Sequence, residues 1–148
     1  MRSGSARVVG EATAYQDAVS RSIRAACARW VAIELEFGLL SGSDVDALLG
    51  PHWPPAGCLA AERRILGVAT KAGRVLYPGF QFDKTARIVR PVMAEVAEIA
   101  LAAGWKDRHI LQWFVVANGE LHGERPVDVI HDRDRLLAAV HADLESVW

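Results

Sequence analysis

Histidine, cysteine and carboxylate side chains are the groups from which catalysis or metal binding would have to be built in this sequence. Three of the five histidines fall late in the chain, at His122, His131 and His141, but their spacing matches no standard metal site. Glu34 and Glu36 are two residues apart, so on a helix they would not face each other as a catalytic pair. No motif for an activated serine, a phosphate-binding glycine loop or a zinc protease is present. The sequence therefore predicts no catalytic residue, no metal site and no cofactor.

Basic side chains in the middle of the chain indicate a different chemistry, the binding of nucleic acid. Residues 59–90 carry seven basic and two acidic side chains, whereas residues 120–148 carry three basic and seven acidic ones. The net charge of -1 for the whole chain hides this asymmetry. Basic side chains supply most of the sequence-independent affinity for a phosphate backbone. The candidate DNA-binding residues are Arg63, Arg64, Lys71 and Arg74, and the alternative is an ordinary solvated charged face.

The first element is a long helix, predicted from about residue 11 to residue 37. Its apolar side chains recur at spacings of three and four residues, which place them on one stripe. They are Tyr15, Val19, Ile23, Ala26, Trp30, Ile33 and Phe37. Two interpretations stay open, packing against the rest of the same chain or pairing with a second copy. Residues 1–40 are assigned to this segment, and a homo-oligomer is expected.

Residues 41–90 are predicted to form a small winged helix-turn-helix module. Ser43 is expected to cap a short helix, and a second short helix follows from about residue 58 to 65. Apolar runs then flank a glycine-containing turn, which is typical of a β-hairpin. In such a module the second helix enters the major groove and the hairpin reaches the neighbouring backbone. Arg63 and Arg64 would lie on the inserted helix, with Lys71 and Arg74 at the tip of the wing.

Residues 91–148 are predicted to form a compact helical bundle, so that the fold class is mainly α. One helix follows Pro91 and ends at Gly104, and a second begins at Lys106 or Asp107. A loop over residues 118–126 leads to one helical turn, and a last helix runs from about residue 132 to 147. The pattern is expected to return to helix after Asp83.

Composition limits the class of protein. The chain has 148 residues, of which 51% are apolar and 24% charged, as in an ordinary globular protein. Cys27 and Cys58 are too few for a disulfide framework, and a cytoplasmic location is the simplest expectation. No apolar stretch reaches the roughly 20 residues that cross a membrane, and the first residues do not form a signal peptide.

The C-terminal residues follow a distinctive order, namely Trp113-Phe114, Asn118, Leu121, Gly123, Pro126 and Asp128-Val129-Ile130. This order resembles the toxin-binding domain of the Xre/MbcA/ParS family of bacterial antitoxins. The run Val75-Leu76-Tyr77-Pro78-Gly79-Phe80-Gln81-Phe82-Asp83, followed by a helix after Arg90-Pro91, is similar to a subgroup with a winged or excisionase-like N-terminal module. The resemblance covers residues from about 40 to 148 and leaves out the first helix.

The resemblance implies a type II antitoxin that binds and neutralises a RES-domain toxin, an enzyme that consumes NAD. Such an antitoxin has no catalysis of its own and represses the shared promoter by binding operator DNA. The motif residues would shape the binding surface: Trp113 fills the core, Asn118 bonds its own loop, Gly123 permits a tight turn and Pro126 starts a helical turn. The expected toxin-binding residues are Glu120, Leu121, His122, Arg125, Glu145 and Trp148.

Two other functions stay open at this point. The first is a stand-alone DNA-binding transcriptional regulator without a toxin partner, which would show salt-dependent promoter binding. The second is a small enzyme that uses the histidines near the C-terminal end. The resemblance favours the antitoxin over the stand-alone regulator, and the residues favour DNA binding over an enzyme.

Overall fold

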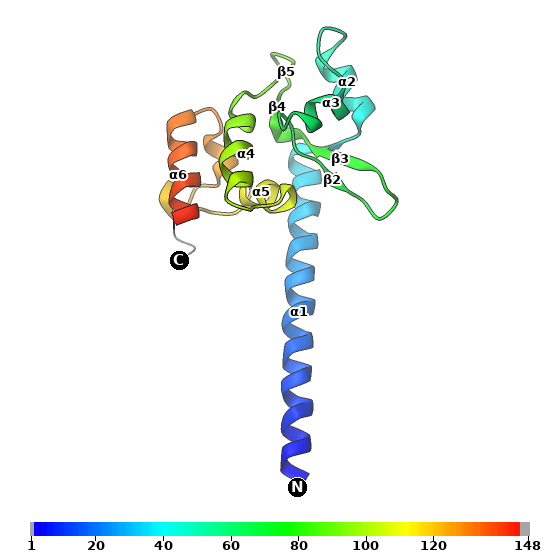
Figure 1. Cartoon of the computed structure of the whole chain (residues 1–148), viewed down its shortest axis with the longest axis vertical. Coiled ribbons are helices and arrows are strands. Elements are labelled where there is room, and N and C mark those ends of the chain that lie inside the picture. The colour runs from blue at the N-terminus through cyan, green and yellow to red at the C-terminus, as the bar shows by residue number, and fades with distance from the viewer. Residues whose placement is uncertain (1, 146–148) are drawn as a thin grey trace. The chain divides into compact units, whose positions relative to one another are not determined.

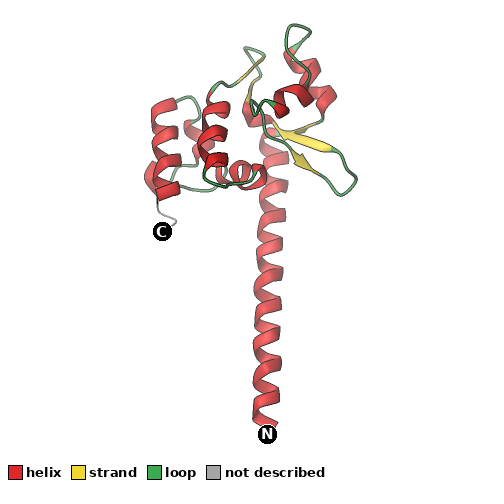
Figure 2. Cartoon of the chain, in the orientation of Figure 1, coloured by secondary structure: helices red, strands yellow, loops and turns green. Residues whose placement is uncertain are grey.

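The computed structural model describes residues 2–145, and it is mainly helical with small antiparallel strands (Figures 1 and 2). This confirms the predicted fold class. The chain divides into two compact units, one up to Ala32 and one from Ile33 onward, so the segments predicted as 41–90 and 91–148 lie in the same unit. None of the described helices is long and apolar enough to cross a membrane.

Helix α1 runs from Arg2 to Phe37, and it begins earlier than the predicted residue 11. Its apolar stripe is exposed over much of its length, since Tyr15, Val19 and Ile23 are 71%, 39% and 58% exposed. Ile33, on the same stripe, is fully buried in the second unit. Packing within the chain therefore accounts for the end of the stripe and leaves its earlier part exposed.

The second unit begins with the connectivity of a winged helix. After α1 come β1 (Leu39–Leu40), α2 (Gly42–Leu49), α3 (Ala56–Ala61), β2 (Val68–Ala69) and β3 (Val75–Pro78). The strands form one antiparallel sheet in the order β1-β3-β2, with Leu40 opposite Tyr77 and Val68 opposite Leu76. The predicted hairpin is thereby confirmed. Strand β1 was not predicted, because a strand of two residues is too short to show an alternation of apolar and polar side chains.

Two local predictions in this region are wrong. Ser41, and not Ser43, caps α2: its hydroxyl accepts from the backbone N–H of Asp44, whose carboxylate accepts from the backbone N–H of Ser41. Both partners satisfy backbone donors at the helix start, which is a capping box. Helix α3 ends at Ala61, and Arg63 has a φ of 60°. A left-handed residue ends a helix, so Arg63 and Arg64 lie beyond the inserted helix.

The run from Tyr77 to Asp83 joins the winged region to the following helices. It forms the end of β3, a short 3-10 helix (η1, Gly79–Gln81) and β4 (Phe82–Asp83), which pairs with β5 (Ile88–Val89). The pairing of β4 with β5 was not predicted, whereas the helix predicted after Pro91 is present and begins at Val92. Gln81 is fully buried, and its side chain accepts from the Leu66 N–H at 2.7 Å and donates to the Leu66 carbonyl at 2.8 Å. This amide holds the segment that leads into β2.

The remaining helices form the predicted bundle. They are α4 (Val92–Ala102), α5 (Asp107–Trp113) and α6 (Arg133–Glu145), with 3-10 turns η2 (Gly119–Leu121) and η3 (Pro126–Val129) between the last two. Helix α4 packs against both α5 and α6, as Figure 1 shows for this part of the chain. An aromatic row from Phe37 through Phe80 to Phe114, with ring centroids 5.5 and 5.2 Å apart, joins this core to the end of α1.

Candidate functional sites

Helix α3 occupies the position of the inserted helix in a winged helix-turn-helix. Its six residues are Ala56-Gly57-Cys58-Leu59-Ala60-Ala61, and Gly57, Cys58 and Ala61 are exposed. Arginine, lysine, asparagine and glutamine are the side chains that read base edges well, and α3 has none of them. Sequence-specific contacts from this helix would therefore be few.

Arg63 and Arg64 follow α3, and both are held by other side chains. Arg63 Nη1 lies 3.0 Å from the Asp107 carboxylate, with 56% of the Arg63 side chain exposed. Arg64 lies 3.9 Å from Glu62, and its guanidinium carbon is 5.1 Å from the centre of the Trp53 ring. Both guanidinium groups remain partly exposed on the surface beside α3.

The tip of the wing carries the other two predicted cations. Lys71 and Arg74 are both exposed. The turn between them is closed by its own bonds, from the Thr70 N–H to the Arg74 carbonyl at 2.7 Å and from the Gly73 N–H to the Thr70 carbonyl at 3.0 Å. Gly73 has a φ of 81°, which a side chain would disfavour. A tight turn thus presents two positive charges to solvent.

The motif residues of the C-terminal part meet at Asp143 on α6. Trp113, which is 9% exposed, donates from Nε1 to the Asp143 carboxylate. Asn118 donates from Nδ2 to the same carboxylate oxygen at 2.9 Å, and its Oδ1 accepts from the backbone N–H of Glu120 at 2.9 Å. Gly123 has a φ of 87°, and its N–H donates to the Asn118 carbonyl. The motif residues fix the shape of this loop.

Arg125 is the centre of an ion-pair cluster. Its guanidinium donates to both carboxylate oxygens of Glu36, at 2.8 and 2.7 Å, and to Asp128 at 3.0 and 2.9 Å. The hydrogen bonds from Arg125 lower the pKa of Glu36 and of Asp128, and the same bonds raise the pKa of Arg125. The predicted partner-binding residue is therefore already paired within the chain.

The other predicted toxin-binding residues differ in exposure. Glu120 and His122 are exposed on the loop, and His122 takes a left-handed conformation with a φ of 56°. Leu121 is 1% exposed, so its side chain belongs to the core and cannot face a partner. Glu145 is exposed at the end of α6, and Trp148 lies outside the described residues.

Sequence reasoning missed several residues that build these sites. Asp143 lies seven residues after Leu136 and three after Val140, and this spacing places it on the buried face of α6. A carboxylate at such a position needs hydrogen-bond partners, and this is the signal in the sequence that could have identified Asp143. Glu36 and Gln81 find partners far along the chain, and nothing in their local sequence predicts these partners. Among the residues that the structure describes, no group of three or more His, Cys, Asp and Glu side chains could hold a metal ion.

Comparison with known protein families gives no match to this sequence, and comparison with curated proteins gives none either. A solved structure with a similar fold is the NMR structure of Rv2175c, with a TM-score of 0.57 and 20% sequence identity. The similarity covers 76% of this chain and 83% of that one. At this level of identity, the likeness concerns the fold alone.

Proposed function

We propose that this chain is a DNA-binding regulatory protein and that it serves as the antitoxin of a toxin–antitoxin pair. The observation that carries the DNA-binding part is the winged-helix connectivity from the end of α1 to β3, with sheet order β1-β3-β2. Winged helices place their second helix and their hairpin against duplex DNA. The cations Arg63, Arg64, Lys71 and Arg74 lie on these elements or beside them. In this proposal the chain acts in the cytoplasm by binding DNA and a toxin, and it catalyses no reaction.

Most of the proposed affinity comes from phosphates rather than from base edges. Helix α3 offers no side chain suited to base readout, whereas the wing tip and the residues after α3 offer positive charge. Phosphate contacts position a protein on DNA but carry no sequence information directly. We therefore expect modest sequence preference and a steep dependence of affinity on salt.

The antitoxin part of the proposal is supported by the assembly of the C-terminal motif residues. Trp113 and Asn118 share Asp143, and Gly123 closes the loop that presents Glu120 and His122 to solvent. The proposed partner is a RES-domain toxin that consumes NAD, whose active site the surface that carries Glu120, His122 and Glu145 would cover. Without such a partner, the chain would be a stand-alone transcriptional regulator.

DNA binding is tested by fluorescence anisotropy with a labelled 25-base-pair duplex from upstream of the gene. In Lys71→Ala/Arg74→Ala we expect roughly tenfold weaker binding at low salt, and a plot of log affinity against log salt that is shallower by about 2. Arg133→Ala/Arg135→Ala removes the same charge from α6 and should match the wild type. No binding of the wild type at 50 mM salt would rule out this function.

Toxin binding is tested by co-expression with the product of the adjacent gene. We expect growth arrest by that product alone, relief of the arrest by this chain, and a complex that survives purification. Glu120→Arg/Glu145→Arg reverses charge on the proposed surface and should abolish relief, while Glu98→Arg on the exposed face of α4 should not. A neighbour that does not arrest growth would favour the stand-alone regulator.

A further inference from the structure

The turn between β4 and β5 places two cations against the ends of two helices. Lys84 donates from Nζ to the carbonyl of Phe37, the last residue of α1, at 3.3 Å. Arg87 donates from Nε to the carbonyl of Leu48 at 2.8 Å and from Nη2 to that of Ala47 at 3.0 Å, in the last turn of α2. Neither helix has a basic residue in its own last turn. The β4–β5 turn thus supplies the positive charge that the C-terminal end of a helix favours.

The conformation of this turn is fixed by its own hydrogen bonds. The Asp83 carboxylate accepts from the backbone N–H groups of Thr85 and Ala86, at 3.1 and 3.0 Å. The backbone N–H of Arg87 donates to the Asp83 carbonyl at 2.7 Å. Arg87 has a φ of 58°, a left-handed conformation that is uncommon for a residue with a side chain. The Arg87 guanidinium is therefore held out from a turn whose backbone is already closed.

The two strands of this hairpin also pack against α2. Phe82 and Val89 lie opposite each other on β4 and β5, and both are buried in the same core cluster as Leu49 of α2. The last turn of α2 is in turn bonded to α3, because the Asp46 carboxylate accepts from the backbone N–H of Ala56 at 2.8 Å. The position of the end of α2 therefore determines where α3 begins.

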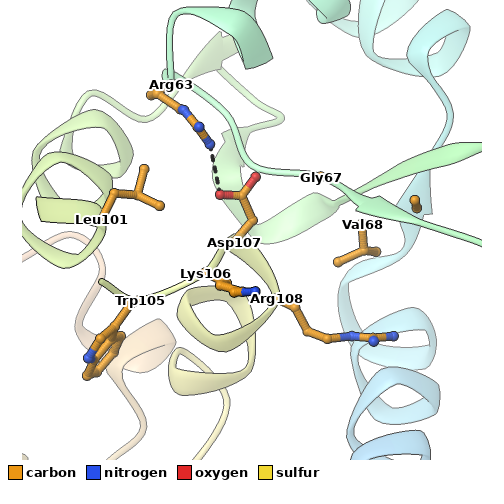
Figure 3. Close-up of a pocket in the computed structure, with 9 residues that line it drawn as sticks. Arg63, Gly67, Val68, Leu101, Trp105, Lys106, Asp107 and Arg108 are labelled. Atoms are coloured by element: carbon orange, nitrogen blue, oxygen red, sulfur yellow. Dashed lines mark hydrogen bonds and ion pairs between the residues drawn. The ribbon is translucent and has the colours of Figure 1, made fainter. Parts of the chain in front are cut away.

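The far end of the same helix pair is held by a second arginine. Arg63 follows α3 and, like Arg87, has a left-handed backbone, with a φ of 60°. Its guanidinium donates to the carboxylate of Asp107, in the first turn of α5, at 3.0 Å (Figure 3). Arginine side chains therefore tie the end of α2 to the β4–β5 turn and the end of α3 to α5.

We infer that Arg87 is a positioning residue for DNA binding: it holds α2, and through Asp46 the start of α3, in the place where α3 meets the duplex, and it contacts no phosphate itself. This rests on the proposed function. The N-terminal residues of an inserted helix are the ones that meet base edges. The exposed side chains of α3 are short, so its contacts depend on where its backbone lies. Arg87 is exposed, and a direct phosphate contact is the competing role.

Arg87→Lys separates the two roles, because it keeps the charge but loses the planar pair of donors. Binding of the full chain to the labelled 25-base-pair duplex is measured between about 50 and 300 mM salt. For Arg87→Lys and Arg87→Ala alike, we expect roughly fivefold weaker binding at low salt, with the salt dependence of the wild type. Arg74→Lys at the tip of the wing is the matched control. It should bind like the wild type, since a phosphate contact needs only the charge.

Hydrogen exchange without DNA measures the hold on α2 directly. The Gly50 N–H donates to the Asp46 carbonyl, and the Ala56 N–H donates to the Asp46 carboxylate. We expect both amides to exchange roughly tenfold faster in Arg87→Ala, because the last turn of α2 then lacks the two bonds from the guanidinium. Exchange in α4 should be unchanged. Faster exchange throughout α4 would show that the whole core is loosened, and would overturn the inference.

The remaining outcomes separate this inference from the proposed function. Wild-type affinity in Arg87→Lys, or a salt dependence shallower by about 1 in Arg87→Ala, would indicate a phosphate contact and overturn the inference. Unchanged affinity in both variants, or unchanged exchange at Gly50 and Ala56, would overturn it as well. In each of these cases, binding by the wild type leaves the proposed function standing. Absence of binding by the wild type would overturn both.

Discussion

Arg125 shows how one side chain can hold distant parts of the second unit together. It joins Glu36, at the end of α1, to Asp128 in η3, and its guanidinium carbon is 5.9 Å from the centre of the Phe37 ring. The side chains of Glu36 and Asp128 are 46% and 44% exposed, so solvent screens each pair. Because one guanidinium contacts two carboxylates and an aromatic face, this cluster nevertheless stabilises the fold more than an isolated surface ion pair would.

The first prediction concerns the dependence of this cluster on pH. The pKa values of Glu36 and Asp128 are lowered in the folded state from ordinary values of 4.5 and 3.8. Their stabilisation is therefore fully present above those values and is lost as the pH falls below them. We expect Arg125→Ala to lower the free energy of unfolding by about 1–2 kcal/mol at pH 7, and by much less near pH 2.

Urea unfolding at the two pH values, followed by circular dichroism, measures this difference. Arg135→Ala is the matched control, because Arg135 makes a single contact with Glu124 at 3.2 Å, and it should cost less than about 0.5 kcal/mol. A cost for Arg125→Ala that stays the same from pH 7 to pH 2 would show that the ion pairs are not its source.

The second prediction concerns the place where the end of α1 meets η1. The Gly79 N–H donates to the Gly38 carbonyl at 2.9 Å, and a Cβ added at Gly79 would overlap the carbonyl oxygen of Phe37. Because backbone atoms cannot move aside as a flexible side chain can, we expect Gly79→Ala to destabilise the protein by about 2–4 kcal/mol. The measurement is the urea midpoint.

Gly57→Ala on α3 is the control for this substitution. A Cβ at Gly57 meets no atom within 4 Å, and the residue lies in a helix. Alanine has a higher helix propensity than glycine, so we expect Gly57→Ala to raise the free energy of unfolding by about 0.5 kcal/mol. Equal destabilisation by both substitutions would show that the close approach to Phe37 is not the cause.

Helices with long apolar stripes and the hairpin were predictable from the sequence, but short elements were not. The 3-10 turn after Arg125 was expected from Pro126, and α4 and α6 from their spacing of apolar residues. Strands β1, β4 and β5 are two residues long, so they have no periodic pattern of apolar residues. They form because β1 pairs with β3 and because β4 and β5 pair with each other. Helix α3 ends early, where Arg63 takes a left-handed conformation, and the Arg63 side chain pairs with Asp107, which is 44 positions away in the sequence.

The third prediction concerns the independence of the second unit. Residues from Ile33 onward have their own core, which includes Ile33, Leu59, Phe82, Phe114 and Leu136. A chain that starts at Arg29 keeps this core and one helical turn before it. We expect its thermal midpoint to lie within about 4 °C of the full chain. A loss of cooperative unfolding would show that the earlier part of α1 is needed for the fold.

The same truncation tests the homo-oligomer expected from the sequence. Tyr15, Val19 and Ile23 are exposed on one stripe of α1, and such a stripe can pair with a second copy. Sedimentation equilibrium should give a dimer for the full chain and a monomer for the chain that starts at Arg29. Equal masses per particle for the two chains would contradict pairing through α1.

The hydrogen bonds of Gln81 have a consequence for engineering. This buried amide fixes Leu66 at the root of the hairpin, while residues 70–74 are closed by bonds among themselves. The base of the hairpin and its turn are thus held by separate sets of hydrogen bonds. A designer could graft another turn of equal length between β2 and β3, and so give the scaffold a new ligand without rebuilding its interior.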